Sequence, residues 1–344
     1  MSETLYALGI GVGTHNAIGE WLEVFFPQPL LRPGLELQSV FDCIGYSDGN
    51  CDLPLSPGQM PALATELAHA GQEALATSVA AMSNSSRPLV ATVLAVDSAP
   101  ATVPETYLKL QLLSHRLVKP HETDLSGAFA VLRNVAWTSE GAIDLAELPT
   151  RQLQARLENR ELEVSCVDKF PKMTNYVVPG GVRIAHTARV RLGAYLGEGT
   201  TIMHEGFVNF NAGTEGPGMI EGRISSGVMI GSGSDLGGSS STMGTLSGGG
   251  NIVNTMGSGC LLGANAGVGI PLGDRCTVEA GLYITAGTKV SLLDDAGQVV
   301  EAIKARELAG KSDLLFRRNS MTGTVECLSN RSAIELNEEL HAHN

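Results

Sequence analysis

The sequence predicts a mixed α/β N-terminal domain followed by a parallel β-helix and a short C-terminal extension. Its 344 residues exceed what a single hydrophobic core usually supports, so more than one structural unit is expected. The first half alternates helix-like and strand-like patterns, whereas the chain from Ile184 to Val290 repeats every six residues. The boundaries that we expect are 1–175, 176–292 and 293–344.

The N-terminal domain is predicted from the periodicity of its apolar residues. An alanine- and leucine-rich segment predicts one helix over 62–82, and an apolar segment predicts a strand over 87–96. A proline opens a second predicted helix over 104–118. A second strand is expected over 126–137 and a third helix over 150–163.

The six-residue period is carried by apolar side chains, first at Ile184, Val190, Leu196, Ile202 and Val208. One short strand and one turn per repeat, with three repeats per coil, give a triangular coil whose apolar residues stack inside. Glycine suits its corners, and 25 of the 41 glycines lie between Gly193 and Gly287. A flexible glycine- and serine-rich linker is the alternative, but it has no reason to keep Ile, Leu or Val at multiples of six.

Interruptions of the period are candidate loops that leave the coil. The period stops around Asn209 to Ile220, stops again at the glycine-rich stretch Thr245–Asn251, and slips by four residues after Val268. Between these points it returns, at Ile224, Ile230, Leu236, Leu262, Leu272, Val278, Ile284 and Val290. The first break presents candidate site residues, and Gly248–Gly250 in the second is expected to supply a loop at a binding groove.

The composition argues against several classes of function. A formal net charge of −13 opposes binding to nucleic acid or to an anionic membrane. No uninterrupted apolar stretch reaches about 18 residues and the N-terminus has no signal-peptide pattern, so we expect no membrane span and a cytoplasmic location. The six cysteines include no C-x-x-C pair, which fits reduced thiols rather than a zinc or redox motif.

Glu221 and Arg223 lie where the period resumes. Residues two apart on a strand share a face, so we expect the carboxylate and the guanidinium to address one ligand. Beside an acyl thioester, the carboxylate could take a proton from an attacking amine or attack the carbonyl itself. A surface ion pair without a catalytic role is the alternative on spacing alone.

Two other segments could bind ligands. His204 and Glu205 suggest a metal, but together with His186 they give only two histidines, and a catalytic zinc site of the three-histidine type needs one more. Residues 304–318 carry five basic side chains against two acidic ones. Paired arginines suit phosphate groups, which coenzyme A carries, although a solvated charged tail is an alternative.

Seven stretches between about Gly181 and Ser320 carry a family resemblance: MHEGFVNFNAGT, EGRIS, GTLSGGGN, LLGAN, VEAGLYITAGT, KARELAG and LLFRRNS. As a set they resemble the tetrahydrodipicolinate N-succinyltransferases, specifically the long form of actinobacteria and pseudomonads. The resemblance implies a left-handed parallel β-helix of hexapeptide repeats and a homotrimer with active sites between neighbouring coils. The implied reaction moves a succinyl group from succinyl-CoA, a cosubstrate, to the amino group of the ring-opened acceptor 2-amino-6-oxopimelate, toward meso-diaminopimelate and lysine, without a prosthetic group.

The resemblance also implies roles for individual residues. Glu221 looks like the family's catalytic carboxylate, which acts either as a general base or as the site of an acyl anhydride. Glu205 resembles a residue that can hold magnesium on the trimer axis, although Ala188 stands where some relatives have an acidic partner. The residues that resemble acyl-CoA and substrate contacts are Arg223, Gly238, Ser241, Ala264, Glu279, Ala280, Gly287, Lys304, Arg317, Arg318, Asn319 and Ser320.

Two other functions fit the same repeat. A non-catalytic trimeric β-helix could serve as a scaffold or bind a metal, and it would have no affinity for an acyl-CoA. An acetyltransferase of the same fold would use acetyl-CoA and another acceptor.

Overall fold

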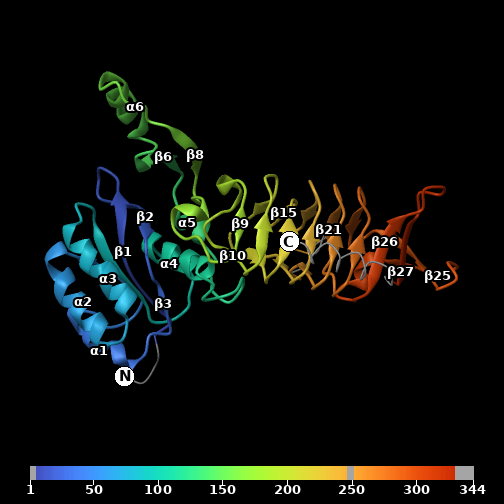
Figure 1. Cartoon of the computed structure of the whole chain (residues 1–344), viewed down its shortest axis with the longest axis horizontal. Coiled ribbons are helices and arrows are strands. Elements are labelled where there is room, and N and C mark those ends of the chain that lie inside the picture. Colours follow the sequence, from blue (N-terminus) through green and yellow to red (C-terminus); the bar gives the residue numbers. More distant parts are fainter. Residues whose placement is uncertain (1–4, 246–251, 330–344) are drawn as a thin grey trace. The chain divides into compact units, whose positions relative to one another are not determined.

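The computed structural model describes residues 5–245 and 252–329, and its contacts divide the chain into two compact units (Figure 1). Unit 1 consists of 1–118, 122–171 and 175–177, and unit 2 contains the remaining residues. The expected groove loop at Gly248–Gly250 lies outside the described residues. None of the helices among the described residues is long and apolar enough to cross a bilayer.

Unit 1 is built on an antiparallel sheet with the strand order β2-β1-β5-β4, and β3 pairs with the end of β1. Its strands are β1 (Ala7–His15), β2 (Trp21–Phe25), β3 (Leu30–Leu31), β4 (Cys51–Leu55) and β5 (Leu89–Leu94). Its larger helices are α1 (Gln38–Ile44), α2 (Met60–His69), α3 (Glu73–Ala81) and α4 (Val103–Ser114).

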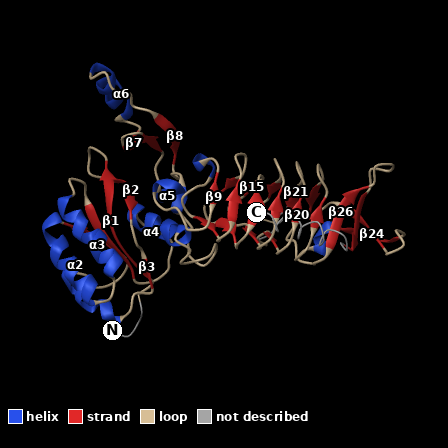
Figure 2. Ribbon diagram, in the orientation of Figure 1, coloured by secondary structure: helices blue, strands red, loops and turns tan. Residues whose placement is uncertain are grey.

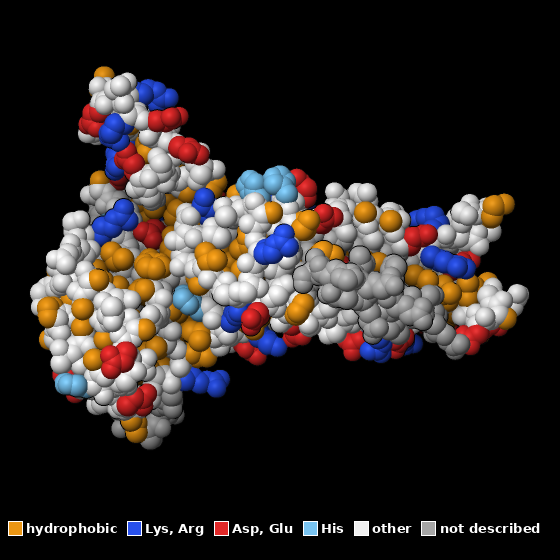
Figure 3. Space-filling view, in the orientation of Figure 1, with side chains coloured by type: hydrophobic (Ala, Val, Ile, Leu, Met, Phe, Trp, Pro, Cys, Tyr) orange, Lys and Arg blue, Asp and Glu red, His pale blue; other side chains and the backbone are white. Residues whose placement is uncertain are grey.

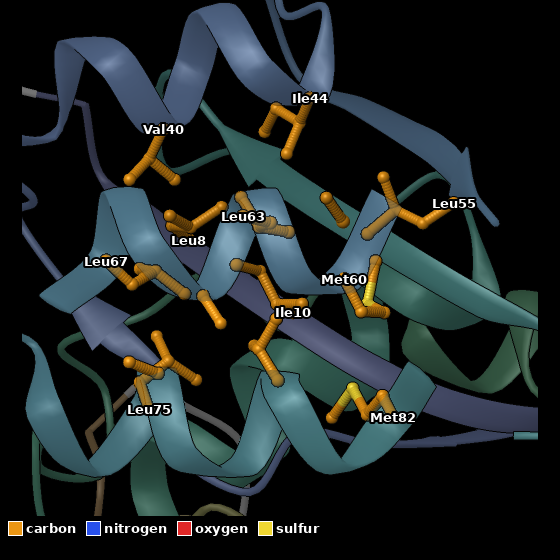
Figure 4. Close-up of a cluster of buried hydrophobic side chains, with 14 of the residues drawn as sticks. Leu8, Ile10, Val40, Ile44, Leu55, Met60, Leu63, Leu67, Leu75 and Met82 are labelled. Carbon is orange, nitrogen blue, oxygen red and sulfur yellow. The ribbon is translucent and has the colours of Figure 1, made fainter. Parts of the chain in front are cut away.

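Helices α1, α2 and α3 cover one face of this sheet, and α4 lies on the other (Figure 2). Leu8 and Ile10 of β1 point into a core with Leu63 and other side chains of the three helices (Figure 4). Gly9, which points the opposite way because side chains alternate along a strand, faces Phe26 and Leu108. The first unit is therefore a sheet with both faces buried.

The predicted elements of unit 1 are only partly right. The strand expected over 87–96 is confirmed as β5, and the helix expected over 104–118 as α4. The single helix expected over 62–82 is wrong, because Gly71 adopts a left-handed conformation with φ +77° and separates α2 from α3. The strand expected over 126–137 is also wrong, because it begins with a short helix.

A small three-stranded sheet and two helices complete unit 1. The elements are α5 (Ala128–Val131), β6 (Val135–Thr138), β7 (Gly141–Asp144), α6 (Leu148–Leu157) and β8 (Val164–Asp168). The sheet has the order β7-β6-β8. Gly127, with φ +82°, starts α5 within the segment that was expected to be a strand. The helix expected over 150–163 is confirmed as α6 but ends earlier.

Unit 2 is a left-handed parallel β-helix whose three faces are sheets of short, parallel strands. The first face runs β10 (Ala194–Leu196), β13 (Ala212–Thr214), β16 (Met229–Ile230) and β19 (Thr255–Met256). The second runs β9 (Arg183–Ile184), β11 (Thr200–Ile202), β14 (Gly218–Ile220), β17 (Asp235–Leu236), β20 (Leu261–Leu262) and β22 (Thr277–Val278). The third runs β12 (Phe207–Val208), β15 (Arg223–Ile224), β18 (Ser241–Thr242), β21 (Gly267–Gly269) and β23 (Tyr283–Thr285).

The predicted apolar positions fill the coil. From Val190 to Val290 every one of them is at most 3% exposed. The interruption expected around Asn209 to Ile220 is wrong, because the coil continues there through β13 and β14. Thr214 takes the apolar position six residues after Val208, and its hydroxyl lies 2.7 Å from that of the equally buried Thr200. The two hydroxyl groups can hydrogen-bond to each other, so these polar side chains are tolerated inside the coil. Because Thr214 is polar, the repeat could not be recognised at this position in the sequence.

The change of register lies one step later, at a short corner. Ile202 pairs with Ile220, and Val208 pairs with Ile224. Five residues lie between Ile202 and Val208 in one coil, but only three lie between Ile220 and Ile224 in the next. The following corner, from Leu236 to Thr242, again has five intervening residues. The corner Glu221–Gly222 is therefore two residues shorter than the corners on both sides of it.

The C-terminal segment returns to the coil. A hairpin of β24 (Lys289–Leu293) and β25 (Val299–Lys304) is followed by the 3-10 helix η6 (Ala305–Leu308). Strand β26 (Leu314–Arg318) then pairs in parallel with β22 and adds a further strand to the second face. Strand β27 (Val325–Ser329) folds back antiparallel on β26. Residues 314–320, called the basic segment below, are thus a strand of the β-helix sheet and the start of the turn that follows it.

Candidate active site

The short corner holds Glu221 at the edge of the coil. The Glu221 amide donates to Leu236 O at 2.8 Å, while its side chain is only partly buried. Within residues 5–245 and 252–329, the carboxylate forms no ion pair or hydrogen bond. An ideal Cβ on Gly238 would lie 3.4 Å from Glu221 Oε2, so the carboxylate lies over this glycine. The corner therefore presents a carboxylate without a partner among the described residues, next to a glycine, which has no side chain to cover its backbone.

Gly238 begins a column of small residues along successive corners. Because Leu236 pairs with Leu262 and Leu262 with Val278, Gly238 is in register with Ala264 and Ala280. The corner itself therefore accepts a Cβ at this position. A Cβ on Gly287 would meet no atom of the described residues within 4 Å. Neither glycine has φ in the left-handed region, so neither backbone conformation nor contact with described protein atoms requires glycine here.

Arg223 and Ser241 form a fixed pair on the third face. They are register partners in β15 and β18, and the Ser241 hydroxyl accepts from Arg223 Nε at 3.1 Å and Nη2 at 2.8 Å. The prediction that Glu221 and Arg223 share one strand is wrong, because the corner separates β14 from β15. Glu221 lies in the corner and Arg223 is the first residue after it, and other N–H donors of the guanidinium remain for an anion.

The basic segment is held by two carboxylates, one at a corner of the coil and one in β27. Glu279 follows β22, and its Oε2 accepts from the backbone N–H of Arg318 at 2.6 Å. The guanidinium of Arg317 donates through Nε to Glu326 at 2.9 Å, and Arg318 Nη1 donates to Gly323 O at 3.1 Å. Both arginine side chains remain exposed.

The other predicted contacts lie around these groups. Asn319 and Ser320 form the turn after β26, and Asn319 is partly buried whereas Ser320 is exposed. Lys304 ends β25, and the next residue, Ala305, donates its N–H to Thr288 O at 2.8 Å. That bond places Lys304 beside the corner that contains Gly287.

Glu205 is engaged within its own chain. Its carboxylate accepts from Arg189 Nη2 at 2.7 Å and lies 2.6 Å from His204 Nδ1. The hydrogen bond to His204 and the charge of Arg189 lower the pKa of Glu205 below its ordinary value. Magnesium prefers a shell of oxygen ligands, and these neighbours are a guanidinium and an imidazole, so they do not fit the ion. Within this one chain, no group of three or more His, Cys, Asp and Glu among the described residues could hold a metal.

Glu326 is a residue of this region that sequence analysis missed. It lies in β27 opposite Arg317 and is only 7% exposed. No motif marks it, because its partners come from the preceding strand and turn. In the sequence, Glu326 is only a charged residue between the apolar Val325 and Cys327, which predicts an exposed position on a strand.

The fold and the site together define a class, the hexapeptide-repeat acyltransferases. A family model described as hexapeptide repeat of succinyl-transferase matches residues 253–286. A second, described as tetrahydrodipicolinate N-succinyltransferase middle, matches residues 132–172, which include the small sheet of unit 1.

Relatives identify the particular family. The chain is 65% identical to a 2,3,4,5-tetrahydropyridine-2,6-dicarboxylate N-succinyltransferase of Pseudomonas putida over the full length of both chains. It is 59% identical to the Vibrio cholerae protein of the same name, over 98% of this chain and 99% of that one. A solved structure from Campylobacter jejuni, assigned as a 2,3,4,5-tetrahydropyridine-2-carboxylate N-succinyltransferase, has a TM-score of 0.86 at 31% identity, over 96% of this chain and 94% of that one. The chain belongs to the tetrahydropyridine-dicarboxylate N-succinyltransferase family.

Proposed function

We propose that the chain transfers a succinyl group from succinyl-CoA to the amino group of tetrahydrodipicolinate in its ring-opened form, with Glu221 as the catalytic carboxylate. The product is N-succinyl-2-amino-6-oxopimelate, an intermediate toward diaminopimelate and lysine. Family membership supports the reaction and the acyl-CoA donor. The observation that carries the residue assignment is the uncommitted carboxylate over Gly238 at the shortened corner.

In the proposed reaction, the amino nitrogen of the acceptor attacks the thioester carbonyl carbon. The C–N bond forms, the C–S bond breaks and CoA leaves as a thiolate. Glu221 takes the proton from the nitrogen, and the proton then passes to the thiolate sulfur. Because no group of the described protein holds the carboxylate, it can accept the proton without first breaking an ion pair.

A second route uses the same residue as a nucleophile. The Glu221 carboxylate would attack the thioester and release CoA, and the acceptor amine would then open the resulting acyl anhydride. The two routes differ in when CoA appears. Rapid mixing of enzyme with succinyl-CoA alone should release one CoA per site by the anhydride route and none by the general-base route.

Cationic side chains are proposed to bind the anionic parts of both substrates. Arg223, oriented by Ser241, suits a carboxylate of the acceptor or of the succinyl group. Lys304, Arg317 and Arg318 suit the phosphates of CoA. The open backbone at Gly238, Gly287 and the neighbouring alanines is where we place the pantetheine arm, whose close approach favours small residues.

The proposal also covers the oligomeric state of the enzyme and its location in the cell. We place the enzyme in the cytoplasm as a homotrimer whose active sites lie between neighbouring coils, as the family resemblance implies. The Arg189–Glu205 pair gives no support to a magnesium ion, and no step of the proposed mechanism uses one. Light scattering should give three times the mass of the 36.0 kDa chain.

The test of the reaction is a comparison of acyl donors. CoA release, followed with a thiol reagent, should depend on the amino-dicarboxylate acceptor and should be faster with succinyl-CoA than with acetyl-CoA. Faster turnover with acetyl-CoA would reject the assigned donor. Failure of a calorimetric titration to detect any binding of CoA would reject an acyl-CoA enzyme altogether.

A further inference from the structure

Strand β27 contains a buried carboxylate, Glu326, that none of the preceding roles uses. Glu326 is register partner of Arg317 in the antiparallel pair. Its Oε2 accepts from Arg317 Nε at 2.9 Å, and its Oε1 accepts from Asn319 Nδ2 at 2.8 Å. Each carboxylate oxygen therefore holds a different residue of the basic segment.

Asn319 links the Glu326 carboxylate to the turn through its own hydrogen bonds. Its side-chain Oδ1 accepts from the N–H groups of Met321 at 3.0 Å and Thr322 at 3.1 Å. Its backbone N–H donates to Thr324 O at 2.8 Å, and its carbonyl accepts from Gly323 N at 2.7 Å. Both ends of the Asn319 side chain are thus used inside the hairpin, so its amide shapes the turn.

Charge also favours this arrangement. On the face shown in Figure 3, basic side chains near the C-terminal end of the coil have acidic side chains beside them. The hydrogen bond from Asn319, together with the one from Arg317 and its charge, lowers the pKa of Glu326 despite burial. The carboxylate is therefore ionised at neutral pH, and as an anion it orients the guanidinium through Nε.

We propose that Glu326 is a positioning residue that orients Arg317 and the following turn for the phosphate groups of the acyl-CoA. The inference rests on the proposed function. Glu326 is buried and acts through Arg317, whose side chain stays 45% exposed and can reach a ligand. Fixing a long side chain before the ligand arrives removes part of the entropy lost on binding.

The experiment compares two donors that share the thioester and the pantetheine arm. Succinyl-CoA also carries the nucleotide part with all the phosphates, which S-succinylpantetheine lacks. In Glu326→Gln, kcat/KM with succinyl-CoA should fall about three- to tenfold through KM, the range expected for ordering one long side chain at binding. The value for S-succinylpantetheine should not change.

The control is Glu140→Gln in unit 1, where Glu140 likewise accepts from two groups, the guanidinium groups of Arg151 and Arg160. This variant should leave both donors unaffected. Equal losses with both donors for Glu326→Gln would assign a merely structural role and overturn the proposal. No loss with either donor would also overturn it.

A second variant keeps the test decisive if Glu326→Gln unfolds the hairpin. Arg317→Met leaves Glu326 in place and should show the same loss confined to succinyl-CoA. A loss of equal size with both donors would overturn the inference. A wild-type enzyme that binds CoA and pantetheine equally well would overturn the phosphate assignment of the proposed function as well, which separates the two failures.

Discussion

Gly238 offers a sharp test of the proposed groove. The change is Gly238→Ala, which adds one methyl group beside the Glu221 carboxylate at a predicted distance of 3.4 Å. Ala264 and Ala280 occupy the same place in the next two coils, so the corner accepts the methyl group. A compatible Gly→Ala change stabilises a protein by about 0.4–1 kcal/mol because it restricts the unfolded chain. We therefore expect an unfolding free energy equal to or above that of the wild type.

Activity should respond in the opposite direction. If the pantetheine arm approaches this backbone, the methyl group overpacks the complex by about 1–3 kcal/mol. That range corresponds to a loss of roughly 5- to 150-fold in kcat/KM for succinyl-CoA. Steady-state kinetics and urea unfolding on the same preparation give both quantities.

Two glycines serve as controls for this prediction. Gly180→Ala adds a methyl group that has no atom of residues 5–245 or 252–329 within 4 Å, and it should change neither quantity appreciably. Gly263→Ala would bring Cβ to 2.5 Å from Ala280 N and should destabilise by about 1–3 kcal/mol or more. Destabilisation of Gly238→Ala to the same extent, or full activity in that variant, would refute the reasoning.

Three other predictions concern stability, pH and thiol reactivity. Thr214→Val should lower the free energy of unfolding, measured from the urea midpoint, by less than about 1 kcal/mol, because the Thr200 hydroxyl keeps its carbonyl partners. A larger loss of stability would show that the hydroxyl pair is essential. Since its folded-state pKa lies below the ordinary 4.5, Glu326 should stabilise the protein above that pH and progressively less as pH falls through the lower value. The thermal midpoints of wild type and Glu326→Gln should therefore converge in acid, and a constant gap would contradict this. Exposed Cys166 should react with a thiol reagent in the native protein, whereas burial raises the pKa of Cys327 to about 12, so it should react only after unfolding; native reactivity of Cys327 would contradict its placement.

The sequence was sufficient for the β-helix because its signal is repeated many times. From Val190 to Val290 each aliphatic residue of the period is buried, so the loss of one position does not hide the whole pattern. Thr214 nevertheless concealed one repeat. The sequence alone does not distinguish a threonine whose hydroxyl is hydrogen-bonded inside the coil from a threonine on a loop. The predicted interruption therefore precedes the actual change of register, which lies at the short corner Glu221–Gly222.

Local elements of unit 1 were harder to predict. Composition between Leu63 and Met82 favours helix throughout, and only the left-handed conformation at Gly71 ends one helix and permits the next. At Gly127 a similar glycine begins a short helix inside an apolar stretch that also suits a strand. In both cases one backbone conformation overrides the propensity of the neighbouring residues.

The sequence could nominate residues for the candidate site, but it could not predict which of them contact one another. Family resemblance supplied Arg223 and Ser241, whereas their direct pairing depends on the coil register. Glu326 could not be found from spacing, because its role arises from the fold of β27 onto β26. Glu205 has a guanidinium partner, Arg189, that only the stacking of successive coils brings near.

The central claim is that the Glu221 carboxylate performs the chemistry of succinyl transfer. The most direct measurement is the turnover of Glu221→Gln with saturating succinyl-CoA and acceptor, beside Glu198→Gln, an exposed carboxylate at another corner of the coil. If Glu221 is the general base, its loss should lower kcat by about 10²- to 10⁴-fold in an enzyme whose assembly and thermal stability match the wild type, while Glu198→Gln retains wild-type turnover. A trimeric Glu221→Gln enzyme with wild-type turnover would contradict the assignment.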